Sequence, residues 1–161
     1  SYPQLFLKEE DAAWRGGAEG FAGRVKDVLE IYKEKSASLP LGPEGGVVTW
    51  HDSCRALNGS GLKDGGRAAL KSLCPDGYRE LAGAGECCGG AGAYAFVHDG
   101  LSDDVLKRKI GSIAAVQAEL VLASSTSCLI QLARGLKRYY PEAKALHLSQ
   151  YVAASVEKYG T

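Results

Sequence analysis

The sequence contains no methionine, carries no net charge and has no long apolar run. Because even the first residue is not methionine, we expect the chain to be a fragment of a longer protein. Its 19 basic and 19 acidic side chains balance, so broad attraction to nucleic acid or to an anionic membrane is not expected. No apolar stretch approaches the roughly 18 residues of a membrane-spanning helix, and the acidic start is unlike a secretory signal. The sequence therefore predicts a cytoplasmic protein with no transmembrane segment.

Motifs of two large classes of protein are also lacking. "GGAGAY" (89–94) is rich in glycine, but it has neither the phosphate-loop pattern G-x-x-x-x-G-K-[ST] nor the dinucleotide pattern G-x-G-x-x-G. No credible set of Ser, His and Asp, and no pair of carboxylates, points to hydrolysis. These absences argue against nucleotide binding at this loop and against hydrolytic chemistry.

What is present is an alternation of helical and extended patterns. Apolar residues at helical spacing predict helices over 19–34, 65–73, 101–118, 128–139 and 150–158. Short β-branched and aromatic runs predict strands over 47–52, 119–124 and 143–149, with a weaker candidate at 78–81. Breaker residues predict loops over 36–46 and over "SCRALNGSG", 53–61.

This alternation predicts a single α/β domain: an open, mainly parallel, four-stranded, Rossmann-like sheet flanked by helices. We expect residues 1–46 to form an N-terminal helical segment and linker that packs on a domain of residues 47–161. Ser102 is expected to cap the helix over 101–118. The basic run "KRK" (107–109) on that helix is expected to be a solvated face, or else a contact with an acidic partner subunit.

The cysteines are the most informative side chains. Five of them, irregularly spaced, do not suit a disulfide-stapled secreted scaffold, and an odd number favours metal binding or redox chemistry. Four directly follow expected strands or the short loops after them: Cys54, Cys87, Cys88 and Cys128. Because the carboxyl ends of parallel strands meet at one edge, we expect these four thiols to converge there. Cys74 lies outside this pattern, and a structural role is expected for it.

The adjacent pair Cys87–Cys88 favours a multi-iron cluster over a single zinc ion, because neighbouring side chains diverge and chelate one ion poorly. Gly89, Gly90 and Gly92 would let backbone N–H groups approach such a cluster. Zinc remains an alternative on this reasoning.

Two further groups bear on the expected centre. Cys128 lies near an expected helix N-terminus, which favours a lowered thiol pKa and ready ligation. His51 ends an expected strand close to Cys54 and is a candidate donor to a cluster or substrate, or an ordinary buried histidine.

Several segments together resemble a known family. They are "HDSC" (51–54), "ECCGGAGAY" (86–94), "LSDDVLKRKIGSIAA" (101–115), "ELVLASSTSCLIQL" (119–132) and "HLSQYVAASV" (147–156). Their order and spacing resemble the cysteine-rich CCG domain, which occurs, usually twice per chain, in heterodisulfide reductase, in the iron–sulfur subunit of glycolate oxidase and in lactate-utilisation proteins. The chain is most similar to the C-terminal CCG domain of a glycolate oxidase-type subunit.

The resemblance implies a redox domain in a flavin-dependent complex that oxidises glycolate or lactate. The implied partners are a flavin-containing dehydrogenase subunit and, in a longer chain, a ferredoxin-like N-terminal module and a first CCG domain. The location would be cytoplasmic, with peripheral attachment to the inner face of the membrane through partner subunits as a further expectation.

The resemblance also implies the ligands, with two departures from the family pattern. Ser125 stands where the first cysteine of a C-x-x-C pair is found, and Ser53 replaces a proline. Four thiolates still suit a [4Fe–4S] cluster, whereas the five-cysteine noncubane cluster is less expected. Two alternatives stay open: a zinc-binding or structural module that docks subunits, and dithiol–disulfide exchange at Cys87–Cys88 as in heterodisulfide reduction.

Overall fold

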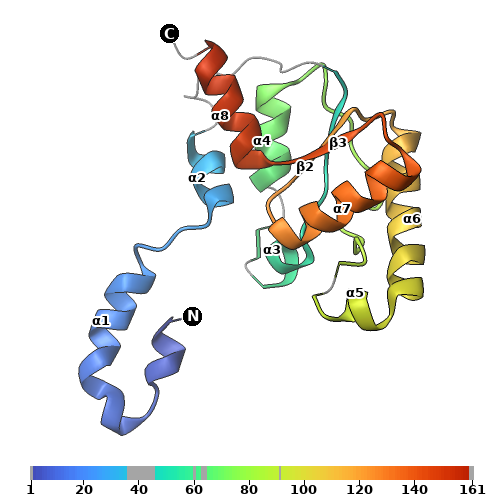
Figure 1. Cartoon of the computed structure of the whole chain (residues 1–161). Helices are drawn as coiled ribbons and strands as arrows, with labels where there is room; N and C mark the ends of the chain where they lie inside the picture. The colour runs from blue at the N-terminus through green and yellow to red at the C-terminus, as the bar shows by residue number, and fades with distance from the viewer. Residues whose placement is uncertain (1, 36–45, 60, 63–64, 91, 160–161) are drawn as a thin grey trace.

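The fold is built on a parallel sheet. The computed structural model describes residues 2–35, 46–59, 61–62, 65–90 and 92–159, and within them three strands are hydrogen-bonded in the order β1-β2-β3 (Figure 1). Their bounds are Val48–Trp50 for β1, Leu120–Ala123 for β2 and Lys144–His147 for β3. Both pairings are parallel, with Leu122 opposite Trp50 on one side and Leu146 on the other. The expected open parallel sheet is confirmed.

The expected fourth strand over 78–81 is wrong. Tyr78 makes a single parallel bridge to Val48, and the described sheet therefore has three strands rather than four. The extended run stops because a turn follows at once, in which the N–H of Ala84 donates to the carbonyl of Leu81 at 3.0 Å.

The position of this bridge matters for the site. The N–H of Val48 donates to Gly77 on one edge of β1, whereas the N–H of His51 donates to Leu122 of β2 on the other edge. The segment around Tyr78, which comes next in the chain, therefore lies along one edge of β1, and β2, which comes later, lies along the other edge. Connections diverge at the carboxyl ends of β1 and β2, which is where ligands bind in open parallel sheets.

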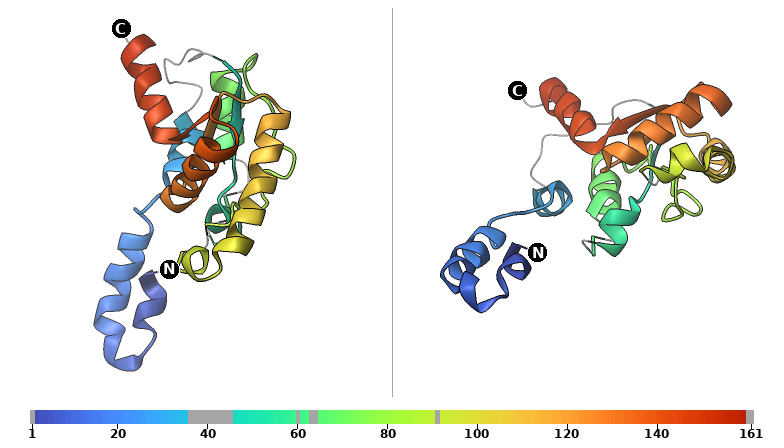
Figure 2. Two further views of the ribbon diagram at one scale, coloured as in Figure 1. Left: turned by 45° about the vertical axis from the view of Figure 1, so that its right-hand side comes forward. Right: turned by 60° about the horizontal axis from the view of Figure 1, so that its bottom comes forward.

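Helices cover both faces of the sheet (Figures 1 and 2). One face carries α2 (Val28–Lys35), α4 (Gly65–Leu73) and α8 (Leu148–Tyr159), and the other carries α6 (Asp99–Ala115) and α7 (Thr126–Tyr139). Two short helices, α3 (Cys54–Asn58) and α5 (Tyr94–Val97), lie in the connections. None of the described helices is both long and apolar enough to span a bilayer.

Alternation along β2 explains the two layers of helices. Val121 and Ala123 belong to the apolar cluster formed with α6 and α7, whereas Leu122 between them belongs to the cluster formed with α4 and α8. Successive side chains of a strand point to opposite faces. Because all three are fully buried, the strand needs apolar cover on both sides, which the helices supply.

The N-terminal region differs from the single helix expected over 19–34. Two short 3₁₀ helices, η1 (Tyr2–Phe6) and η2 (Glu9–Asp11), precede α1 (Ala12–Ala22), and a non-helical segment separates α1 from α2. Asp27 starts the new helix, since its carboxylate accepts the N–H of Leu29 at 2.9 Å while Glu30 accepts the N–H of Asp27 at 2.6 Å. Such a reciprocal capping box defines a helix start. Figures 1 and 2 show α1 and η1 extending away from the sheet.

Two other expectations need correction. The segment "SCRALNGSG" was expected to be a loop, but its first half forms α3. The long helix starts earlier than expected, at Asp99, and ends at Ala115, because Gln117 adopts a left-handed conformation with φ of 53°. The expected loop over 36–46 lies outside the described residues except for Gly46.

A buried ion pair fixes the carboxyl end of β1. Asp52 is 5% exposed and accepts hydrogen bonds from the indole of Trp50, at 2.7 Å, and from the guanidinium of Arg67. Arg67 comes from α4 and also pairs with Glu80 at 2.8 Å. The N–H of Asp52 donates to Ala84 at 3.0 Å. The end of β1, α4 and the start of the loop that carries Cys87 and Cys88, called the cysteine loop below, are thereby held together.

Candidate metal centre

Three chemically reactive side chains meet at the edge of the sheet. His51 follows β1, Cys128 lies in the first turn of α7 after β2, and Cys88 lies in the loop that follows the Tyr78 bridge. One ligand atom from each lies within 4.8 Å of the other two, and all three residues are buried. The convergence expected from the parallel topology is therefore found for two of the four thiols, together with His51.

His51 is the most unusual member of this group. Its side chain is 1% exposed, and neither ring nitrogen has a hydrogen-bond partner among the described residues. A buried polar group without a partner costs free energy, and a metal ion would satisfy one ring nitrogen. Imidazole and thiolate are the ligands preferred by zinc and are also found on iron–sulfur centres. The donor set therefore fits a thiophilic metal.

The two buried thiols differ in their affinity for a proton. Contact with Cys88, aided by His51 and Ser125, lowers the pKa of Cys128 to about 4 in spite of its burial. The same contact, together with burial, raises the pKa of Cys88. The contact therefore favours the thiolate form of Cys128, which is the form that binds metal.

The other two predicted thiols lie outside this buried group. Cys54 is exposed at the first position of α3, and Cys87 is exposed beside Cys88. The sulfur of Cys87 accepts the N–H of Gly89 at 3.3 Å, the kind of backbone contact that was expected from the glycines. The full four-thiol ligand set stays a prediction, as do the roles of Gly90 and Gly92.

The conformation of the cysteine loop requires glycine. Gly89 has φ of +81°, and a Cβ atom there would lie 2.5 Å from the carbonyl oxygen of Ser102. Gly90 has little more room, because its Cβ would lie 3.1 Å from Cβ of Gln131 and 3.4 Å from the sulfur of Cys88. Residues with side chains would push the loop away from α6 and α7.

Two buried polar side chains hold the loop in place. The hydroxyl of Ser102 in α6 donates to the carbonyl of Gly89 at 2.8 Å, and the amide of Gln131 in α7 donates to that hydroxyl at 3.0 Å. Ser102 was expected to cap a helix, but it lies inside α6 and binds the loop instead. The cap was misassigned because the helix starts at Asp99, two residues earlier than expected.

Replacing Ser102 by alanine is expected to lower the free energy of unfolding by about 1–3 kcal/mol, because the amide of Gln131 and the carbonyl of Gly89 lose a buried partner. Denaturant unfolding measures this loss. Ser112 is the matched control, since it lies on the same helix and bonds only to the backbone of its preceding turn, at 3.3 Å from Arg108. Its replacement by alanine should change stability by less than about 0.5 kcal/mol. Equal losses would contradict the role of Ser102.

Lys109 is a functional candidate that the sequence analysis missed. The run "KRK" was expected to be solvated, and this is wrong for Lys109, which is only 2% exposed. Its ammonium donates to the carbonyl of Gly83, at the start of the cysteine loop. Burial lowers its pKa, while Glu86 and the thiols of Cys88 and Cys87 oppose that shift. The amine of Lys109 therefore faces the loop, and its charged form would favour thiolates there.

Cys74 has the structural environment that was expected. It is buried in the apolar cluster on the α4 and α8 side. Its thiol donates to the carbonyl of Leu70 at 3.4 Å and accepts from the hydroxyl of Tyr151 at 3.5 Å. Burial raises its pKa, so it stays protonated at neutral pH. All five cysteines are free.

Comparison with known proteins gives a consistent picture. The model of the CCG family of cysteine-rich domains matches residues 48–133. A probable glycolate oxidase iron–sulfur subunit from Bacillus subtilis (strain 168) is 30% identical over 149 residues, which cover 89% of this chain and 33% of that protein. Lactate utilization protein A 2 from Bacillus mycoides (strain KBAB4) is 26% identical over 156 residues, covering 92% of this chain and 62% of that protein. The chain thus spans between a third and about three fifths of these relatives.

Proposed function

The chain belongs to the CCG family of cysteine-rich domains, and we propose from this that it is the metal-binding redox module of an iron–sulfur subunit in a complex that oxidises a 2-hydroxy acid such as glycolate or lactate. The observation that carries the proposal is the buried meeting of Cys88, Cys128 and His51 at the carboxyl ends of β1 and β2. The relatives, an iron–sulfur subunit of glycolate oxidase and a lactate utilization protein, supply the class of substrate.

In this proposal, four thiolates hold the metal and neighbouring groups stabilise their charge. Cys88 and Cys128 are the proposed buried ligands, and Cys54 and Cys87 complete the proposed set of four thiolates. Bound there, an iron–sulfur cluster of the [4Fe–4S] type would supply one-electron transfer. The N–H of Gly89 donates to Cys87, and Lys109 places a cation against the loop. Both features stabilise negative charge on sulfur.

The partners follow from the proposed role. A flavin-containing dehydrogenase subunit would oxidise the substrate, and this module would receive electrons from it or pass them on. A ferredoxin-like module and a first CCG domain would belong to the longer protein, since the chain spans only 33% of the glycolate oxidase-type relative. On this proposal the module alone has no turnover.

A second candidate is a single zinc ion in a structural module. The observation that favours it is His51, whose two unpartnered ring nitrogens lie in the same buried group as Cys88 and Cys128. A nitrogen and two sulfurs fill three of the four positions of a tetrahedral zinc site. Such a site would join β1 to α7 and would have no redox role.

One experiment separates the two candidates. Protein purified without oxygen is analysed for iron, acid-labile sulfide and zinc, and His51→Ala is analysed beside it. The redox proposal expects a brown protein with iron and sulfide, and it expects the variant to keep its iron because thiolates alone hold the cluster. A colourless protein with one zinc per chain, lost in the variant, would contradict the redox proposal and support the structural one.

A further inference from the structure

A polar cavity of about 470 Å³ lies at the carboxyl ends of β1 and β2 and has no assigned role. Its walls come from three places: the turn and first residues of α7 (124–127), the start of α3, and Asp27 at the start of α2. No cysteine is among the residues that line it. The cavity adjoins the proposed thiol centre, since Ser53 and Arg55 flank Cys54 and Ser127 precedes Cys128, at the place where the chain connections diverge.

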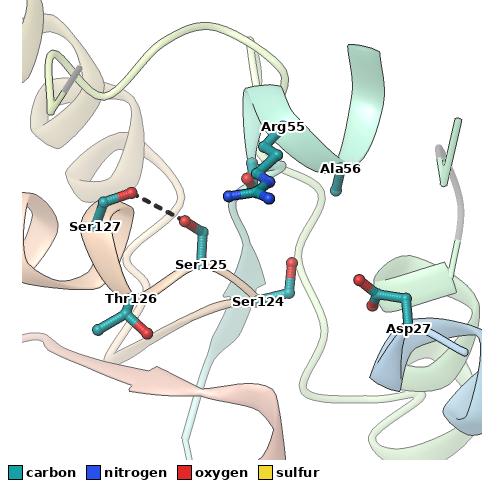
Figure 3. Close-up of a pocket in the computed structure, with 8 residues that line it drawn as sticks. Asp27, Arg55, Ala56, Ser124, Ser125, Thr126 and Ser127 are labelled. Carbon is teal, nitrogen blue, oxygen red and sulfur yellow. Dashed lines mark hydrogen bonds between the residues drawn. The ribbon is translucent and has the colours of Figure 1, made fainter. Parts of the chain in front are cut away.

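Arg55 supplies the cavity with a positive charge. Figure 3 shows its guanidinium extending from α3 toward the turn that carries Ser124, Ser125 and Ser127. Within the part of the chain that the structure describes, no hydrogen bond or ion pair occupies the guanidinium. An arginine fork that faces a cavity is suited to bind a planar oxyanion through two parallel hydrogen bonds.

Neutral donors surround this charge. Ser53 is 2% exposed and lines the cavity, and its hydroxyl makes no capping hydrogen bond to α3. A hydroxyl that lines the cavity and caps no helix can donate to, or accept from, a ligand there. Ser125 and Ser127 also line the cavity and share a hydrogen bond of 3.0 Å (Figure 3). The first N–H groups of α7 receive no side-chain cap from Ser125, which leaves them free to bind an anion.

The charges of Arg55 and Asp27 limit the net charge of a ligand that the cavity can bind. Among the described residues that line the cavity, Asp27 is the one carboxylate, and one of its oxygens already accepts the N–H of Leu29. One guanidinium facing one carboxylate suits a singly charged anion better than a phosphate dianion, because a second negative charge would be repelled by Asp27.

From these features we propose that the cavity binds a small monocarboxylate, whose carboxylate pairs with Arg55 and whose other polar atoms contact Ser53 and the α7 turn. The proposal needs no metal, so its test can fail while the proposed metal centre is correct, and the reverse. It adds to the electron-relay role a site for a small organic acid beside that centre.

The test is a titration of the ¹⁵N-labelled chain, prepared without iron, with sodium lactate as the probe and amide NMR shifts as the readout. We expect saturable shifts at Ser125, Thr126 and Ser127. Arg55→Met should weaken the apparent affinity by at least about tenfold, since it removes a charge-assisted pair. Arg24→Met is the matched control, an exposed arginine that is not among the residues lining the cavity, and it should bind lactate as the parent chain does.

Three outcomes would overturn the proposal: no lactate-dependent shifts at these amides, unchanged affinity in Arg55→Met, or sulfate binding as tightly as lactate, which would show a general anion site. If Arg55→Met loses the folded spectrum, Ser53→Ala decides instead. The Ser53→Ala variant keeps the charge of Arg55, and it should weaken lactate binding by a few-fold because it loses one hydroxyl.

Discussion

Replacing either Cys88 or Cys128 by serine is expected to remove the metal from the protein, whichever metal it is. Both thiols are buried in one group with His51, and contact with Cys88 lowers the pKa of Cys128, which favours its thiolate form. Serine offers a hard, protonated oxygen that thiophilic metals bind poorly. Changing residues that only support metal ligands costs about 10–100-fold in affinity, so losing a buried ligand should cost at least as much.

The control is Cys74→Ser, which removes a buried thiol of similar exposure from the opposite side of the sheet. Its metal content, measured by mass spectrometry of the purified protein, should equal that of the parent chain. Cys54→Ser and Cys87→Ser then distinguish the ligand sets. Loss of metal in both supports four thiolates, whereas retention in both supports the smaller set with His51. Unchanged metal in Cys128→Ser would contradict a centre at this edge of the sheet.

Asp52→Ala is expected to cause the largest loss of stability among the substitutions considered. Asp52 is 5% exposed and binds both Trp50 and Arg67, so its removal leaves an indole N–H unpaired and a guanidinium without its buried partner. Breaking a buried ion pair costs about 3–5 kcal/mol, and we expect about 3 kcal/mol because Arg67 keeps Glu80. Chemical denaturation followed by circular dichroism measures the change in the free energy of unfolding.

Glu80→Ala is the matched control, because Glu80 binds the same guanidinium but its side chain is 50% exposed. Exposed ion pairs contribute at most about 1 kcal/mol. A loss in Glu80→Ala as large as that in Asp52→Ala would show that Arg67, and not burial of the pair, sets the contribution. Because Asp52 adjoins His51, the folded fraction of Asp52→Ala should also bind metal less tightly.

Elements with a strong local signal could be predicted from the sequence. The helix expected over 65–73 is α4, and the strand expected over 119–124 contains β2, because one apolar face or one short β-branched run specifies each. The break between α1 and α2 was missed although "DVLE" (27–30) carries a capping box, since the apolar spacing continues across it. Tyr78 has the composition of a strand residue, but the turn after Leu81 leaves only one bridge.

The sequence by itself determined the parallel α/β order, and with it the edge at which Cys88 and Cys128 meet, because strand ends in such a sheet share one side. Only the tertiary structure decided which neighbours complete the site. His51 joins the two thiols, Ser102 leaves its expected cap to hold Gly89, and Lys109 turns inward from a basic run. These roles depend on burial and on contacts between residues far apart in the chain, for which local sequence patterns carry no signal.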